Sequence, residues 1–269
     1  MAAHATAVEP LSQLPRVSAR TGIEQIFVYD LARESPHIAM PRPEIDLVVR
    51  FGAGAGSGID AHTFGARVRV HRKTPRGVRR TVTARLRLGA TGAVLGATAS
   101  QIAGRIVPLE ELWGGADVRR LLDRLAKADA TSDAIAIVES AIADRIARAG
   151  RLALRDLDAR VSPLALGAAR KLQDERINVV AGDLGVTERH LRRVFRETVG
   201  LGPKAFAKLA RFRRAVDLAL EANGAEAWAE IAIATGYYDQ AHLIAEFRDI
   251  AGTTPRALLR ELRTSRSIP

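Results

Sequence analysis

The 269-residue chain is predicted to fold as two domains of different class, an α+β domain at the N-terminus and an all-α domain of about seven helices at the C-terminus. Its length allows two ordinary domains of roughly 100 to 200 residues each. Strand-like patterns occur before residue 89, and beyond it apolar residues recur at the three- and four-residue spacing of helices. The order of these two patterns along the chain predicts the two classes.

Four segments before residue 89 have the patterns of β-strands: 25–29, 45–51, 66–70 and 81–88. Each is either rich in β-branched and aromatic residues or alternates between apolar and polar ones. Residues 52–58 contain four glycines and are predicted to be a flexible loop between two strands. This loop has neither a Gly-x-Gly-x-x-Gly register nor a following Lys-Ser/Thr, so it does not predict a nucleotide-binding site.

Helical periodicity after residue 89 predicts three helices in the first domain, over 92–104, 116–128 and 133–150. The α+β domain is therefore expected to cover residues 1–150. Residues 151–163 are polar and end in a proline that breaks helices, so they are expected to form a linker. The all-α domain is then expected at 164–263, followed by a tail at 264–269.

The composition is that of a globular protein with a strong positive charge. Apolar residues make up 47% of the chain, outside the low-hydrophobicity range of disordered proteins. Lys and Arg number 41 against 30 Asp and Glu, a net charge of +11. This excess favours a polyanionic partner such as nucleic acid or an acidic membrane surface, although a coding sequence biased towards arginine codons would give the same total.

Residue types and motifs that the sequence lacks exclude several classes of enzyme and of metal-binding site. The chain has no cysteine, which excludes disulfides, thiolate-bound zinc and cysteine nucleophiles. Its six histidines, at positions 4, 37, 62, 71, 190 and 242, have no metal-ligand spacing, and no serine lies in a Gly-x-Ser-x-Gly motif. Glu110 and Glu111 are adjacent, so on a helix they would point about 100° apart. No catalytic residue, metal or cofactor is therefore expected.

The sequence also lacks the signals of membrane proteins. No window approaches the roughly 20 consecutive apolar residues of a membrane span. The N-terminus has no basic head followed by an apolar core, as a secretion signal would have. A cytoplasmic protein with no membrane partner is expected.

The segment that begins at Val180 has the pattern of two short helices joined by a tight turn. Ala181 provides the small residue needed where the helices cross, and Gly185 suits a left-handed turn four residues later. Thr187 is placed to cap the second helix. Further apolar residues lie at the positions that such a pair must bury: Leu184, Val186, Leu191 and Val194. This combination predicts a helix-turn-helix unit.

The second helix of this unit carries four arginines at spacings of three and four residues: Arg189, Arg192, Arg193 and Arg196. A guanidinium group can donate two hydrogen bonds to guanine O6 and N7, worth roughly 1–3 kcal/mol of discrimination per contact. The alternative is an ordinary solvated face. Exposed helices usually intersperse both signs of charge, however, and only Glu188 and Glu197 balance this run. The pattern favours a helix that enters a nucleic-acid groove.

The same pattern recurs later in the chain. Ala232 and Gly236 repeat the four-residue offset, and Gly236 follows Gly185 by 51 residues. Between the copies, the 19 residues 203–221 are predicted to form one helix, opened by Pro203 and closed by an Asn-Gly pair. Such a helix spans about 28 Å, which with helix widths added would allow two recognition helices to lie one DNA turn, about 34 Å, apart. Two helix-turn-helix units joined by a long linker helix are predicted.

Residues 164–262 resemble the AraC/XylS type of DNA-binding domain. The resemblance is carried by Ile231-Ala232, Gly236-Tyr237, Asp239-Gln240, His242, Phe247, Gly252 and Thr254-Pro255, and in the first half by Arg193-x-Phe195 and Gly200-x-x-Pro203. It implies seven helices and a sequence-specific transcription regulator that binds double-stranded DNA. The residues then expected to contact DNA are Arg189, His190, Arg192, Arg193, Arg196, Lys204, Gln240, Ala241 and His242. Asp239 and Thr254 are expected to cap helices, and Phe195, Leu243 and Phe247 to lie in the core.

The second recognition helix departs from the family pattern. Ala245 and Glu246 occupy a part of it where relatives commonly carry a basic residue. Residues 187–214 hold nine Lys and Arg against two acids, whereas 224–263 hold four Arg against six acids. We therefore expect the first recognition helix, from Thr187 to Val199, to dominate phosphate attraction and base reading.

The N-terminal domain resembles, through residues 43–48 and 92–114, an uncharacterised domain that is often fused to this DNA-binding unit. The resemblance implies no particular ligand, but such a domain would sense a small-molecule effector or mediate assembly. Residues 61–109 contain ten Lys and Arg and no acid. The arginines of the basic stretch 67–87 form either an anionic effector site or strand faces exposed to solvent, and we favour the second explanation.

The resemblance also names partners for the whole chain, namely RNA polymerase and a second copy in a homodimer. Two other classes of protein stay open at this point. One is an architectural protein that binds DNA or RNA without sequence preference, for which phosphate contacts alone would suffice. The other is an enzyme with an appended DNA-binding module.

Overall fold

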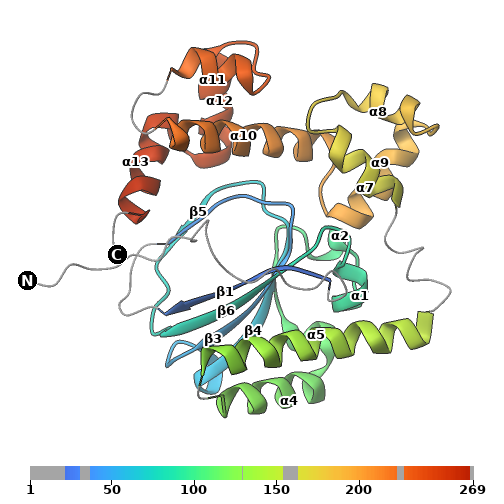
Figure 1. Ribbon diagram of the computed structural model, residues 1–269, viewed down its shortest axis with the longest axis vertical. Coiled ribbons are helices and arrows are strands. Elements are labelled where there is room, and N and C mark those ends of the chain that lie inside the picture. Colours follow the sequence, from blue (N-terminus) through green and yellow to red (C-terminus); the bar gives the residue numbers. More distant parts are fainter. Residues whose placement is uncertain (1–21, 31–36, 129, 154–162, 223–226, 267–269) are drawn as a thin grey trace, which may run out of the picture.

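The computed structural model describes residues 22–30, 37–128, 130–153, 163–222 and 227–266. An antiparallel sheet with helices on one face forms the N-terminal region (Figure 1). On the other side of the sheet lies a C-terminal region whose described residues form seven helices and no strand. The predicted α+β and all-α classes are confirmed.

The sheet has five strands in the order β1-β6-β3-β4-β7, each antiparallel to its neighbours. Their bounds are β1 Ile23–Asp30, β3 Asp46–Phe51, β4 Ile59–Phe64, β6 Arg80–Leu86 and β7 Ile106–Pro108. A two-stranded ribbon is formed by β2 (His37–Ala39) and β5 (His71–Lys73). Alternate residues of the central strands, such as Leu47 and Val82, are fully buried on one face, which is the two-residue period expected of strands.

Helices cover the buried face of the sheet. They are α1 (Thr91–Leu95), α2 (Ala99–Ile102), α3 (Leu109–Trp113), α4 (Gly115–Ala126) and α5 (Thr131–Ala153). Leu121 and Leu125 of α4 and Val138 and Ile142 of α5 are buried in one cluster with the strands. Their three- and four-residue spacing places them on the inner face of each helix, as the sequence predicts.

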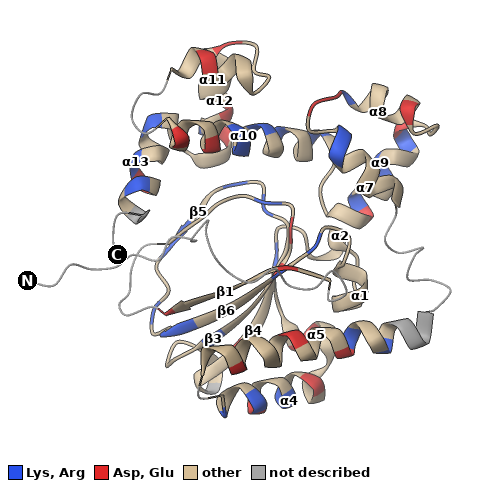
Figure 2. Cartoon of the chain, in the orientation of Figure 1, with Lys and Arg blue, Asp and Glu red and all other residues tan. Residues whose placement is uncertain are grey.

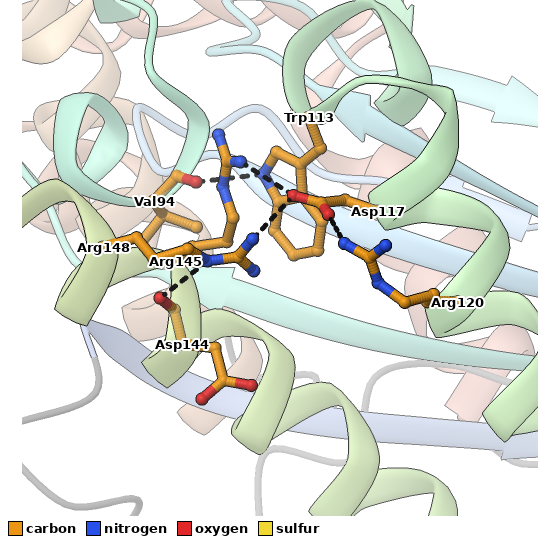
Figure 3. Close-up of polar contacts among 7 residues, drawn as sticks. All are labelled: Val94, Trp113, Asp117, Arg120, Asp144, Arg145 and Arg148. Carbon is orange, nitrogen blue, oxygen red and sulfur yellow. Dashed lines mark hydrogen bonds and ion pairs between the residues drawn. The ribbon is translucent and has the colours of Figure 1, made fainter.

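An acidic side chain holds these helices together (Figure 3). Asp117 of α4 accepts hydrogen bonds from Arg145 (3.3 Å) and Arg148 (3.0 Å) of α5. It accepts another from Arg120 of its own helix. The indole of Trp113 donates to the carbonyl oxygen of Val94 at 3.0 Å, and the Arg145 guanidinium lies 5.4 Å from the centre of that ring. These contacts join α1 to α3, α3 to α5 and α4 to α5 on the helix-covered face of the sheet.

The described C-terminal helices are α7 (Pro163–Lys171), α8 (Ile177–Asp183), α9 (Glu188–Val199), α10 (Pro203–Glu221), α11 (Trp228–Ala234), α12 (Gln240–Ala251) and α13 (Pro255–Arg266). Helix α10 runs between two groups of helices, α7–α9 at one end and α11–α13 at the other (Figure 1). Its Phe206 packs against Phe195 of α9, with ring centres 5.3 Å apart, and its Phe212 against Phe247 of α12 at 4.6 Å. The predicted linker helix over 203–221 is confirmed.

The predicted strand at 66–70 is wrong. This segment has only an isolated bridge at Arg67, and the strands lie on either side of it, at β4 and β5. Ala66 and Val70 pack instead against the C-terminal helices, and the Val70 amide donates to the carbonyl oxygen of Ile250 at 2.9 Å. The alternating pattern therefore reflects burial against a distant part of the chain.

Other boundaries differ from the predicted ones. The helix predicted at 92–104 is divided into α1 and α2, because Gly96 adopts a φ of 72° and ends α1. Helix α5 continues to Ala153, into the predicted linker, of which residues 154–162 lie outside the described part. Helix α13 continues to Arg266, so the predicted tail begins as helix.

Replacing Asp117 by alanine is expected to lower the free energy of unfolding by about 1.5–3 kcal/mol, because charge-assisted hydrogen bonds are lost and guanidinium groups are left close together. Chemical denaturation of the full chain measures the change. The control Asp144→Ala removes an exposed acid of α5 and should change the value by less than about 0.5 kcal/mol. Equal losses in the two variants would contradict the role of Asp117.

Candidate nucleic-acid interface

Helices α8 and α9 form a pair with the local geometry that the sequence predicts. Gly185 has a φ of 65°, in the left-handed region that favours glycine. The Val186 amide donates to the carbonyl oxygen of Ala181 at 3.0 Å and closes the turn onto α8. Thr187 Oγ1 accepts a hydrogen bond from the His190 amide at 3.2 Å, so the predicted cap of α9 is confirmed.

Helices α11 and α12 repeat this geometry. Gly236 has a φ of 81°, and the Tyr237 amide donates to the carbonyl oxygen of Ala232 at 2.9 Å, the same bond 51 residues later. Asp239 caps α12 by accepting from the His242 amide at 2.7 Å. The second turn is one residue longer than the first, because residues 235–239 separate α11 from α12 and residues 184–187 separate α8 from α9.

The extra residue of the second turn is Tyr238, which the sequence predictions missed. Its side chain is 90% exposed, while the adjacent Tyr237 is 4% exposed. The signal available in the sequence was the tyrosine pair itself, since only one of two consecutive residues before a helix cap can enter the core. Tyr238 places an aromatic ring and a hydroxyl at the solvent-facing start of α12.

The two recognition helices can be aligned from their caps, Thr187 and Asp239, which are 52 residues apart. Phe195 and Phe247 then coincide, and both are fully buried. The other equivalent pairs are Arg189 with Ala241, Arg192 with Ile244, Arg193 with Ala245 and Arg196 with Arg248. Of the four arginines of α9, only Arg196 has a cationic counterpart in α12.

All four arginines of α9 are exposed, and Figure 2 shows the basic residues along this helix in blue. Arg192 pairs with Glu188 one turn away, and Arg193 pairs with Glu197 at 3.7 Å. Within the described part of the chain, Arg189 and Arg196 make no ion pair. Exposed pairs of this kind are worth about 1 kcal/mol or less, so a DNA phosphate or base can replace the glutamates.

The remaining predicted contact residues are also at the surface. Lys204 is exposed in the first turn of α10, and Gln240, Ala241 and His242 are exposed in the first turn of α12. The His242 ring accepts a hydrogen bond from the Tyr238 amide at 3.4 Å, which holds the imidazole close to the turn. No carboxylate faces these residues at ion-pair distance in the described part of the chain.

Glu246 does not face solvent, although it lies in the part of α12 where relatives commonly carry a basic residue. It is 7% exposed, and its carboxylate accepts hydrogen bonds from Tyr237 Oη at 2.7 Å and from Arg211 of α10 at 2.9 Å. Burial and the neighbouring Glu246 carboxylate raise the pKa of the Tyr237 phenol, which therefore remains a hydrogen-bond donor. The acid is a structural link between α12 and α10.

Cations of α10 that add to the charge of residues 187–214 are largely neutralised by acids elsewhere in the fold. Besides the Arg211–Glu246 pair, ion pairs join Lys208 to Asp249, Arg213 to Glu44 and Arg214 to Asp174. Some acids of the second unit are thus partners of α10. Within residues 187–214, most of the exposed positive charge without an acid from another element lies on α9, in keeping with the predicted inequality between the two recognition helices.

The basic stretch 67–87 fits neither of its two explanations as a whole. Arg72 donates to Glu261 of α13 at 2.7 Å and to the carbonyl oxygen of Ala251, at the end of α12, at 2.9 Å. Arg69 pairs with Asp249 of α12 at 3.5 Å. Other members bind acids of the sheet, as Arg67 and Arg85 bind Asp46. Arg76 and Arg79 are exposed, as the favoured explanation requires.

A second contact between the two regions lies at the end of α9. Gly200 ends the helix with a φ of 84°, and a Cβ atom at this position would lie 2.9 Å from the carbonyl oxygen of Ala99 in α2. Only glycine both adopts this φ without strain and allows so close an approach. The N-terminal region therefore contacts the first helix pair through α2 and the second through the segment around the β2–β5 ribbon.

The chain is similar to known proteins over part or most of its length. Residues 180–261 match a family described as a helix-turn-helix domain. The C-terminal domain of AraT, a response regulator from Geobacillus stearothermophilus, is 25% identical, with 38% of this chain and 88% of that chain covered and a TM-score of 0.35. A structure of ToxT from Vibrio cholerae bound to (E)-4-(8-methylnaphthalen-1-yl)but-3-enoic acid is also similar. Its sequence is 13% identical, 88% of this chain and 98% of that chain are covered, and the TM-score is 0.46. No curated protein matches the chain.

Two helix pairs whose turns share a left-handed glycine and a closing hydrogen bond, each with a capped second helix, define the C-terminal region as a helix-turn-helix DNA-binding domain. This class is the one that the resemblance of residues 164–262 to the AraC/XylS type implies. The protein thus combines a β-rich N-terminal region with an all-helical C-terminal region that contains a helix-turn-helix domain.

The described residues contain no helix with the length and apolar character needed to cross a membrane. They also contain no group of three or more His, Asp or Glu side chains placed to hold a metal ion.

Replacing Glu246 by alanine is expected to lower the free energy of unfolding by about 3 kcal/mol, because Arg211 and the Tyr237 hydroxyl would lose a largely buried partner. Denaturant titration measures the loss. The control Glu230→Ala removes an exposed acid of α11 and should cost less than about 0.5 kcal/mol. A double-mutant cycle with Arg211→Ala that shows no coupling would refute the assignment.

Replacing Arg72 by alanine is expected to loosen the attachment of the ribbon to α12 and α13, at a cost of about 1 kcal/mol. Hydrogen exchange of the amides at residues 250–262 should become faster. Arg76→Ala removes an exposed arginine of the same basic stretch and should leave exchange unchanged. Similar exchange in both variants would show that Arg72 does not hold the two regions together.

Proposed function

We propose that this chain is a transcription regulator that binds DNA sequence-specifically and that α9 makes most of the contacts. The observation that carries the proposal is the exposed run of arginines on α9, three of which correspond to Ala241, Ile244 and Ala245 in α12. Arginine combines attraction to phosphate with two parallel hydrogen bonds to guanine, so it supplies both affinity and base discrimination. Helix α12 has no comparable set of donors.

On this proposal, α9 and α12 enter successive segments of the major groove on one face of the duplex. Helix α10 has 19 residues and so a length of about 28 Å, close to the rise of one DNA turn once helix widths are added. Arg189, Arg192 and Arg196 would face the bases or phosphates, with His190, Arg193 and Lys204 at the edge of the contact. Gln240, Ala241 and His242 would approach the second segment with fewer hydrogen bonds.

We also propose that the N-terminal region controls how the two helix pairs are held. It contacts the first pair at Gly200 and the second at Ile250, Ala251 and Glu261. A small-molecule effector that altered either contact would change the presentation of α9 relative to α12. RNA polymerase and a second copy of the chain are the further partners expected of such a regulator.

Replacing Arg192 by alanine should weaken binding to a site selected from a random DNA pool by about 1–3 kcal/mol, roughly 5- to 150-fold. Gln240→Ala should weaken it by less than about threefold, because α12 contributes little. Fluorescence anisotropy at fixed salt measures both affinities. Arg124→Ala removes an exposed arginine of α4 and should have no effect.

Equal losses from Arg192→Ala and Gln240→Ala would contradict the dominance of α9. Binding that depends steeply on salt but yields no preferred site would favour an architectural protein, because phosphate contacts carry no sequence information.

A further inference from the structure

A cavity of about 440 Å³ lies between the recognition helix α9 and the helices α1 and α2 of the N-terminal region. One wall is made of small residues such as Gly92 and Gly96, and the other of α9 side chains, among them Arg193 and Glu197. The volume falls within the roughly 300–1,000 Å³ that is usual for small-molecule sites. An occupant would contact both regions of the chain at once.

Two largely buried threonines line this cavity, one from α1 and one from α9. Thr91 of α1 is 4% exposed and Thr198 of α9 is 8% exposed. Neither makes a hydrogen bond with any other residue that the structure describes. Neither hydroxyl oxygen is among the fully buried polar atoms that lack a partner, so each can donate a hydrogen bond to, and accept one from, an occupant of the cavity.

The charged groups of the cavity wall are one cation and one anion side by side. Arg193 Nη1 and Glu197 Oε1 are 3.7 Å apart, and both side chains are more than half exposed. A ligand with a single charge would satisfy one of these groups and repel the other. A guanidinium group can bind the carboxylate of a ligand through two parallel hydrogen bonds. A carboxylate such as that of glutamate can accept hydrogen bonds from the ammonium group of a ligand.

We propose that this cavity binds a small zwitterion of the α-amino acid class. Its carboxylate would bind Arg193, its ammonium group Glu197, and the two threonine hydroxyls would complete the hydrogen bonds. The cavity lining contains no aromatic ring, and Val194 is its largest apolar residue, so a small polar side chain fits best. Since Arg193 lies between Arg192 and Arg196 on α9, occupancy would act directly on the recognition helix, a step that rests on the proposed function.

The test is a binding screen of the full chain, without DNA, against the twenty common L-amino acids and inorganic phosphate. Thermal unfolding would identify binders, and isothermal titration calorimetry would measure their affinities. At least one small polar amino acid should bind with a Kd below about 1 mM, roughly −4 kcal/mol. Its decarboxylated amine and its deaminated acid should each bind at least tenfold more weakly. No binder, or equal binding of the acid or of phosphate, would overturn the proposal.

Threonine variants separate a ligand-binding role from a packing role. Thr91→Val and Thr198→Val should each weaken amino acid binding about tenfold, whereas the Tm of the free protein should stay the same or rise because no hydrogen bond is lost. The control Thr81→Val makes the same change on the sheet, away from the cavity, and should not alter amino acid affinity. Unchanged affinity in both cavity variants would refute the site.

Coupling to DNA is measured last. The amino acid should change DNA affinity, and DNA should change amino acid affinity by the same factor, because linkage is reciprocal. A factor of one would overturn the regulatory part of the proposal. If the chain binds no DNA sequence selectively, the proposed function fails, but the ligand measurement made without DNA still decides whether the cavity is a binding site.

Discussion

Neither helix-turn-helix pair can bury a core of its own, and both depend on one shared helix, α10. Each pair has one helix of seven residues and one of twelve, too little apolar surface for independent stability. Phe206 and Phe212, less than two turns apart on α10, pack against Phe195 and Phe247, the most deeply buried aromatic residues of the two recognition helices. A single continuous helix therefore links the two recognition helices by packing, and the contacts of the N-terminal region with each pair add to what sets their relative position.

Arginine has two distinct roles in this chain, and only the fold separates them. On α9 the guanidinium groups are exposed and at most paired with glutamates of the same helix. On α10 and in part of the basic stretch they are bound to acids of other elements, as Arg211 is to Glu246 and Arg72 to Glu261. The net charge of +11 thus overstates the cations that remain to attract a polyanion. Pairs between distant segments also explain why acids gather in the second unit.

Features encoded by local sequence were predictable. Gly185 and Gly236 mark turns because few other residues adopt a positive φ, and Thr187 and Asp239 mark helix starts because their side chains cap free amides. Features that depend on distant partners were not. The pattern at 66–70 is indistinguishable from a strand until α12 is known to lie against it, and Glu246 looks exposed until Arg211, 35 residues earlier, is placed beside it. The cavity is formed by segments about 100 residues apart, which no periodicity reveals.

Gly200 serves two purposes at once, since it terminates α9 and sets how near α2 can come. It does so without facing the surface that would meet DNA. Any side chain at this position would push the N-terminal region away while leaving every arginine of α9 in place. Related chains could therefore diverge in how they are controlled and still recognise the same promoters, with the change confined to a residue that a comparison of DNA-contacting positions would overlook.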